Sequence, residues 1–228
     1  MDDSNRNDQG DRIVFWGRTP IDKLIDGYRN FHRTTFARQR RRFEQLAAKG
    51  QKPKILIISC SDSRVSPSMV FDTPPGSIFV ARNIANIVPP YNPDGGPRSI
   101  GAAAEYAIKV LKVSDIIIKG HARCGGVHAL INNGSGLPQN DFLKPWVEVA
   151  APALKLLPPN FESLGEAEKR RVSEHAVIQN SIMNLSGYPW VRDRLEAGTL
   201  RIHGWHFDFE HGKLTRLEHE SGEWVEVK

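Results

Sequence analysis

The sequence has only two cysteines, Cys60 and Cys124, among 228 residues, so at most one disulfide could form. A chain of this length can build a sizeable hydrophobic core without such support. In a reducing compartment, two lone cysteines are expected to bind a metal, take part in catalysis or remain inert. The use of this pair is therefore the first question that the sequence raises.

Long hydrophobic runs are also missing. The longest, Ile55–Ile58 and Ile116–Ile118, are far shorter than the ~20 apolar residues that span a membrane. The first residues are polar and acidic and lack the apolar segment of a secretory signal. We therefore expect no membrane partner, a cytoplasmic location and a disordered or extended leader over residues 1–18.

Internal repeats, low-complexity tracts and nucleic-acid reading motifs are absent as well. The net charge of +5 is largely local, because four arginines stand close together at Arg38, Arg40, Arg41 and Arg42. No aromatic platform is interleaved with them. We interpret these arginines as a solvated helix face and expect no nucleic-acid partner.

Helical and strand patterns alternate along the rest of the chain. Residues 20–49 predict a helix that Thr19 caps and Gly50 closes. Two segments that look like strands, Lys54–Ser59 and Asp115–Gly120, are continuously apolar, as in a parallel sheet covered on both faces. A strand or two after residue 200 are expected at a sheet edge. A strand is also expected at Ser77–Ala81, between Lys54–Ser59 and Asp115–Gly120. After the first helix, helices are expected over 98–111, from about Gly125, over 141–156 and over 165–185.

This alternation predicts an α/β fold with a mostly parallel central β-sheet flanked by helices. The long first helix forms an N-terminal helical arm in this interpretation. We expect residues 19–228 to make a single domain.

Reactive side chains follow two of the expected strands directly. Cys60, Asp62 and Arg64 come after the first strand, and His121 and Cys124 come after the third. Parallel strands gather their carboxyl ends at one side of a sheet, where ligands bind. Two thiolates and one imidazole suit a tetrahedral zinc ion whose fourth position is open for catalysis. A redox disulfide between the cysteines is the alternative, but it leaves His121 and Asp62 without a role.

Three motifs resemble those of the β-class carbonic anhydrases. They are C-x-D-x-R at residues 60–64, FVARNIANIVPPY at residues 79–91 and GHARCGG at residues 120–126. The resemblance is close from about Gly50 to Leu130 and continues loosely to about Phe209. It implies one zinc ion per chain, held by Cys60, His121 and Cys124, with the Asp62–Arg64 pair beside it.

The resemblance also implies a set of substrate-binding residues, as in the plant-type branch of the family. These are Gln51, Phe79, Ile84 in place of a valine, Tyr106 and Gly125. Phe79 and Tyr106 look like the aromatic residues that reach the pocket from a neighbouring subunit. We therefore expect a homodimer, or a tetramer or octamer built from dimers.

The bicarbonate-regulated bacterial branch of the family differs at two positions. It has a tryptophan and a glycine where this chain has Ile57 and Ser59. This difference favours the plant-type branch.

The activity implied by the resemblance is the reversible hydration of CO2 to bicarbonate and a proton. Zinc-bound hydroxide would be the nucleophile, Asp62 would orient it by accepting its hydrogen bond, and Arg64 would hold Asp62 ionised. Two alternatives stay open: hydrolysis of CS2 or COS on the same fold, and a non-catalytic protein that binds zinc or bicarbonate for regulation. A structural zinc site would need neither Asp62 and Arg64 nor Gln51, which argues against the second alternative.

Overall fold

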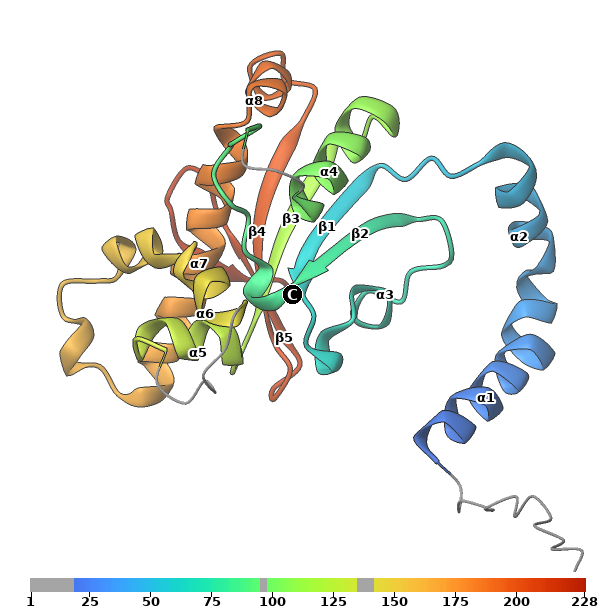
Figure 1. Cartoon of the computed structure of the whole chain (residues 1–228), viewed down its shortest axis with the longest axis horizontal. Coiled ribbons are helices and arrows are strands. Elements are labelled where there is room, and N and C mark those ends of the chain that lie inside the picture. The colour runs from blue at the N-terminus through green and yellow to red at the C-terminus, as the bar shows by residue number, and fades with distance from the viewer. Residues whose placement is uncertain (1–18, 95–97, 135–141) are drawn as a thin grey trace, which may run out of the picture. The chain divides into compact units, whose positions relative to one another are not determined.

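The computed structural model describes residues 19–94, 98–134 and 142–228 (Figure 1). Contacts divide the chain into two units, one that ends at Gly50 and one from Gln51 to Lys228. The leader expected over residues 1–18 lies outside the described residues. The single domain expected over residues 19–228 stays a prediction.

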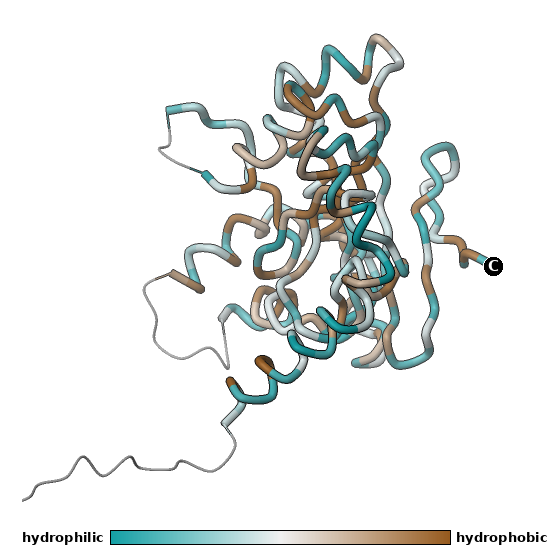
Figure 2. The backbone as a smooth tube through the Cα atoms, turned by 90° about the vertical axis from the view of Figure 1, so that its right-hand side faces the viewer, coloured by the Kyte–Doolittle hydropathy of each residue, from teal (hydrophilic) through white to brown (hydrophobic). Residues whose placement is uncertain are grey.

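The first unit is the expected N-terminal helix. It consists of α1 (Pro20–Phe31), a π-helical turn (His32–Phe36) and α2 (Ala37–Lys49). Thr19 and Asp22 form a reciprocal cap, since each side chain accepts a hydrogen bond from the other residue's backbone N–H. Hydrophobic and hydrophilic residues follow one another along it (Figure 2), as expected for an amphipathic helix.

The second unit is built on a six-stranded sheet with the order β2-β1-β3-β4-β5-β6. The pairs among β1 to β4 are parallel, and β5 and β6 are added antiparallel. The strands are β1 (Ile55–Cys60), β2 (Ile78–Asn83), β3 (Asp115–His121), β4 (Arg201–Asp208), β5 (Lys213–Leu217) and β6 (Trp224–Glu226). The predicted α/β class, with a mostly parallel sheet and flanking helices, is confirmed.

The expected edge position is wrong for β4, which lies between β3 and β5. Its burial alternates along the strand, and its inward positions include Gly204 and His206 in place of apolar side chains. A Cβ at Gly204 would come within 3.0 Å of Ile182 and 3.1 Å of Ile178, so the glycine lets α7 approach closely. The hydrophobic signal of an inner strand is therefore missing from the sequence.

The helices of the second unit follow the predicted pattern with three differences. The expected helix over 141–156 ends early because Pro152 has no backbone N–H, and a 3-10 segment (Ala151–Leu156) follows it. Helices α3 and α8 were not predicted. The helices are α3 (Pro67–Val70), α4 (Ser99–Glu105) with a π-helical turn (Tyr106–Val110), α5 (Gly125–Ile131), α6 (Leu143–Glu148), α7 (Glu166–Ser186) and α8 (Pro189–Glu196).

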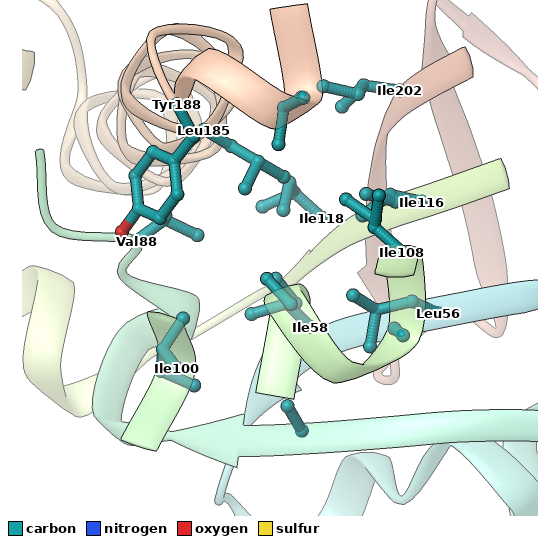
Figure 3. Close-up of a cluster of buried hydrophobic side chains, with 14 of the residues drawn as sticks. Leu56, Ile58, Val88, Ile100, Ile108, Ile116, Ile118, Leu185, Tyr188 and Ile202 are labelled. Carbon is teal, nitrogen blue, oxygen red and sulfur yellow. The ribbon is translucent and has the colours of Figure 1, made fainter. Parts of the chain in front are cut away.

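A hydrophobic core fixes the strands that carry the candidate ligands (Figure 3). Leu56 and Ile58 of β1 and Ile116 and Ile118 of β3 are fully buried in it, together with side chains of α4 and α7. Burial of one such side chain contributes about 1.5–3 kcal/mol. The two strands therefore hold their carboxyl ends rigidly next to each other. No helix in the part of the chain that the structure describes is long and apolar enough to cross a membrane.

His175 of α7 is a buried histidine without a hydrogen-bond partner for Nε2 among the described residues. Its ring stacks on Trp224 at a centroid distance of 3.8 Å and meets the ring of His206 edge-on at 4.8 Å. Burial, together with the nearby His206 and Arg171, lowers the pKa of His175 to about 2. The folded chain therefore keeps this imidazole neutral.

This burial predicts a loss of stability in mild acid. In the unfolded chain a histidine binds a proton below pH ~6.5, whereas folded His175 does not. The contribution of neutral His175 to the free energy of unfolding is thus fully present above pH ~6.5. It is lost as the pH falls, which lowers the free energy of unfolding by about 2 kcal/mol at pH 5. His175→Phe keeps the ring on Trp224 and should remove this loss. Urea unfolding at pH 8 and pH 5 measures it, with the exposed His32→Phe as control; parallel losses for wild type and His175→Phe would contradict the prediction.

Candidate metal centre

Three side chains that lie far apart in the sequence meet at the carboxyl ends of β1 and β3. Cys60 is the last residue of β1, His121 is the last residue of β3, and Cys124 directly precedes α5. The Sγ atoms of the two cysteines are 3.9 Å apart, and the candidate ligand atoms of all three residues lie within 4.8 Å of one another. All three side chains are buried. This cluster could bind a metal ion.

The imidazole of His121 has a tautomer and an environment that suit metal binding. Its Nδ1 lies 2.8 Å from the carbonyl oxygen of Ala122, which fixes the tautomer with the proton on Nδ1. Nε2 is buried and has no hydrogen-bond partner among the described residues. A buried polar atom of this kind costs free energy unless something binds it. A metal ion at Nε2 would satisfy it, and the Nδ1 bond is the orienting contact that histidine ligands ordinarily have.

The two thiols are strongly coupled to each other. The hydrogen bond between the two thiols lowers the pKa of Cys60, although burial opposes this. The same hydrogen bond and burial raise the pKa of Cys124. The backbone N–H of Ala85 also donates to Cys60 Sγ, at 3.4 Å. A second thiolate would form here only with a cation to offset the repulsion, and a divalent ion that prefers sulfur and nitrogen meets that need.

Asp62 and Arg64 form a fork-shaped pair beside the cluster. Arg64 Nε donates to Asp62 Oδ1 at 2.9 Å, and Arg64 Nη2 donates to Oδ2 at 2.7 Å. The backbone N–H of Arg64 also donates to Oδ1. These bonds hold the pKa of Asp62 well below its usual range. Asp62 is therefore an ionised carboxylate with a fixed direction, and it is not among the three clustered ligands.

Arg82 and Asn83, at the end of β2, anchor the segments around the cluster. Arg82 donates to the carbonyl oxygens of Cys60 at 2.8 Å and Asp62 at 2.6 Å. The Asn83 side chain both donates to and accepts from the backbone of Ile87, which closes the turn that contains Ala85. Arg82 and Asn83 thus fix the backbone at Cys60, at Asp62 and around Ala85.

The two glycines after Cys124 differ in how closely other residues pack around them. A Cβ at Gly126 would lie 2.7 Å from Ile84 and 2.9 Å from the Ala85 side chain, so α5 approaches this turn closely only because residue 126 is glycine. A Cβ at Gly125 would meet no described atom within 4 Å. Close packing at the start of α5 therefore requires glycine at residue 126 and not at residue 125. Ile84, expected as a pocket residue, lies next to the start of α5.

The other expected pocket residues lie away from the cluster of their own chain. Phe79 pairs with Leu56 in the sheet, four residues before the level of Cys60, which is about 13 Å along the strand. The ring of Tyr106 lies 5.8 Å from that of Phe79. Gln51 precedes β1 altogether and is exposed. A pocket role for these residues therefore needs a second copy of the chain, as expected for Phe79 and Tyr106.

Three buried charged or polar residues near the cluster were not predicted. Glu174 and His206 pair with each other at 2.8 Å, and Glu174 also contacts the backbone of a candidate ligand. Lys119 of β3 is fully buried, donates to the carbonyl oxygen of Val65 at 3.0 Å, and has its pKa lowered to about 8 by burial. Only Lys119 left a signal in the sequence, as a lone charge within an apolar strand.

Comparisons with known proteins agree with one another. The chain matches the family described as carbonic anhydrase over residues 55–214. It is 34% identical to beta carbonic anhydrase 3 of Arabidopsis thaliana over 200 residues, which cover 87% of this chain and 77% of that protein. The solved structure of the beta-carbonic anhydrase CcaA is similar with a TM-score of 0.85 and 33% identity, over 91% of this chain and 92% of that one. One of two tetrameric beta-carbonic anhydrases of Sordaria macrospora is similar with a TM-score of 0.76 and 27% identity, over 90% of this chain and 98% of that one.

The fold and the cluster define an α/β protein with a candidate metal centre at the carboxyl ends of its parallel strands. The chain belongs to the β class of the carbonic anhydrase family and is an enzyme of that family.

Proposed function

We propose that this chain catalyses the reversible hydration of CO2 with one zinc ion per chain, held by Cys60, His121 and Cys124. The observation that carries the proposal is the buried Nε2 of His121, which has no hydrogen-bond partner among the described residues and lies within 4.8 Å of two thiols. A carboxylate that a guanidinium holds in place lies beside this cluster. Zinc in such a site acidifies a bound water and so supplies a nucleophile near neutral pH.

Asp62 orients the nucleophilic water in this proposal. Both of its oxygens bond to Arg64, which keeps the carboxylate ionised and limits its rotation. It can only accept a hydrogen bond, so a nucleophilic water beside it must point its proton toward Asp62 and a lone pair elsewhere. Arg64 is itself held, since its guanidinium lies 4.3 Å from the ring centre of Phe209. The pair therefore orients the attack on CO2.

The substrate pocket in this proposal is formed by residues of two subunits. CO2 is small and apolar and needs apolar walls with one donor. Ile84 supplies a wall from the same chain, and Phe79, Tyr106 and Gln51 would come from a neighbouring subunit. This arrangement is supported by their distance from the cluster of their own chain and by the tetrameric relative of Sordaria macrospora.

A reconstitution experiment tests the proposal. Protein stripped of metal should be inactive, and CO2 hydration should rise in proportion to added zinc and level off at about one equivalent per chain. Activity that is full without zinc, or zinc binding that brings no hydration, would contradict it. The cytoplasmic location stays a prediction.

A mixing experiment tests the shared pocket. Phe79→Ala chains keep their metal ligands but lack an aromatic wall, and Cys124→Ser chains keep the wall but lack a ligand. Each protein alone should be nearly inactive. Dimers formed from an equal mixture should recover about a quarter of the wild-type rate, because half of them hold one intact site. If Phe79 served its own chain, no hybrid would contain an intact site and the mixture would stay inactive.

A further inference from the structure

Glu174 of α7 connects the ligand segment to the interior of the protein. It is only 4% exposed, and its Oε1 accepts the backbone N–H of Cys124 at 3.1 Å. Its Oε2 lies 2.8 Å from Nε2 of His206, which is equally buried on β4. Neither side chain belongs to the three clustered candidate ligands. Their contact to the site is the backbone of Cys124.

The backbone between the two ligands of this segment is under strain. Arg123, which stands between His121 and Cys124, has a φ of +56°, which is unusual for a residue with a Cβ. Such a conformation costs of the order of 1–3 kcal/mol and persists only where the surroundings enforce it. The N–H of Ala122 is held by the carbonyl oxygen of Phe207 at 3.0 Å. The N–H of Cys124 is held by Glu174, so one anchor lies on each side of Arg123.

His206 holds the Glu174 side chain in place. It is opposite Gly120 in the pairing of β3 with β4, directly beside the ligand strand. A buried carboxylate is costly unless its oxygens are bonded, and here the Cys124 N–H and His206 each take one oxygen. Rotation of the Glu174 side chain would break both bonds. The pair thus links α7, β4 and the ligand segment.

A cavity of about 400 Å³ lies beside the pair, and Glu174, His206 and Arg123 are among the residues that line it. A smaller cavity of about 100 Å³ is lined by both Cys124 and Glu174, so water should reach the Cys124 N–H when the Glu174 carboxylate is removed. The chain should therefore fold without that carboxylate, with a less fixed ligand segment.

We propose that Glu174, supported by His206, is a positioning residue that holds Cys124 in place for the metal. It does not touch the substrate. Its removal should speed zinc release and weaken zinc affinity by roughly 10- to 100-fold, the effect usual for outer contacts of metal ligands. The inference rests on the proposed zinc site, but it does not depend on which reaction that site performs.

The test compares zinc binding by wild type, Glu174→Ala and Glu174→Gln. Zinc affinity is measured by competition with a chromophoric chelator, and the rate of zinc release is measured in excess chelator. Glu174→Ala should show the full effect. Glu174→Gln should show a smaller one, because its amide oxygen can still accept the Cys124 N–H. Circular dichroism establishes that each variant is folded.

Tyr188→Phe is the matched control. Its hydroxyl is buried and donates to the carbonyl oxygen of Pro89 at 3.0 Å, so the variant also loses one buried hydrogen bond but no contact to a candidate ligand. It should be less stable, by about 1 kcal/mol, with unchanged zinc affinity. Folded Glu174→Ala with wild-type zinc affinity would overturn the inference. Equal losses of zinc affinity in Glu174→Ala and Tyr188→Phe would overturn it as well, because zinc loss would then follow stability alone.

The result also separates this inference from the proposed function. Wild-type protein that binds zinc but does not hydrate CO2 would end the proposed function and leave the Glu174 result standing. Wild-type protein that hydrates CO2, with a Glu174→Ala variant that binds zinc normally, would overturn the inference on Glu174 and leave the proposed function standing.

Discussion

Asp62→Asn is expected to keep its zinc and lose most of its CO2 hydration, with kcat lowered roughly 100-fold or more. The physical reason is the fork between Asp62 and Arg64, in which each carboxylate oxygen accepts from a guanidinium N–H. An amide replaces one acceptor by an N–H group that faces the donors of Arg64. The side chain must turn, and it can no longer serve as a fixed acceptor for the nucleophile. Steady-state hydration kinetics on protein with verified zinc content measure the effect.

Asp115→Asn provides the matched control. Asp115 forms the same fork with Arg201, at 2.8 and 3.0 Å, but it is the first residue of β3 and lies at the opposite end of the strand from His121. This variant should lose stability and retain its kcat. If both variants hydrate CO2 at the wild-type rate, the Asp62–Arg64 pair is a structural ion pair only.

Cys124→Ser is expected to lose most of its zinc and, with it, nearly all activity. A serine hydroxyl does not ionise at neutral pH, so it cannot replace the thiolate that a zinc site requires. Metal analysis after gel filtration should show a fall from about one zinc per chain to a small fraction. Ser59→Ala, a buried neighbour on β1 outside the three-residue cluster, should keep its zinc. A Cys124→Ser protein with full zinc content would show that the ion, if bound, is held elsewhere.

The sequence predicted the part of the fold that depends on local pattern. Strands β1 and β3 each contain a continuous apolar run, Ile55–Ile58 and Ile116–Ile118, and each expected boundary lay within one residue of the observed one. Because parallel strands place their carboxyl ends together, the meeting of Cys60 with His121 followed from the topology alone. The N-terminal helix was equally clear, since its cap and its closing Gly50 are local signals.

The parts that were missed depend on contacts between distant segments. Glu174 and His206 stand 32 positions apart, and neither has a neighbour in the sequence that marks it as buried. Strand β4 lacks the apolar signal of an inner strand because Gly204 makes room for α7. Lys119 is tolerated inside because its ammonium group donates to the Val65 carbonyl oxygen and lies over the ring of Phe207. Local patterns contain no information on such partners.

The most direct test of the central claim is a stopped-flow measurement of initial CO2 hydration by protein of known zinc content, with COS and CS2 offered to the same preparation. We expect a saturable hydration rate that is proportional to zinc-loaded protein and is lost in Asp62→Asn, whose zinc remains bound. A hydration rate no higher than that of buffer, with or without turnover of COS or CS2, would contradict it.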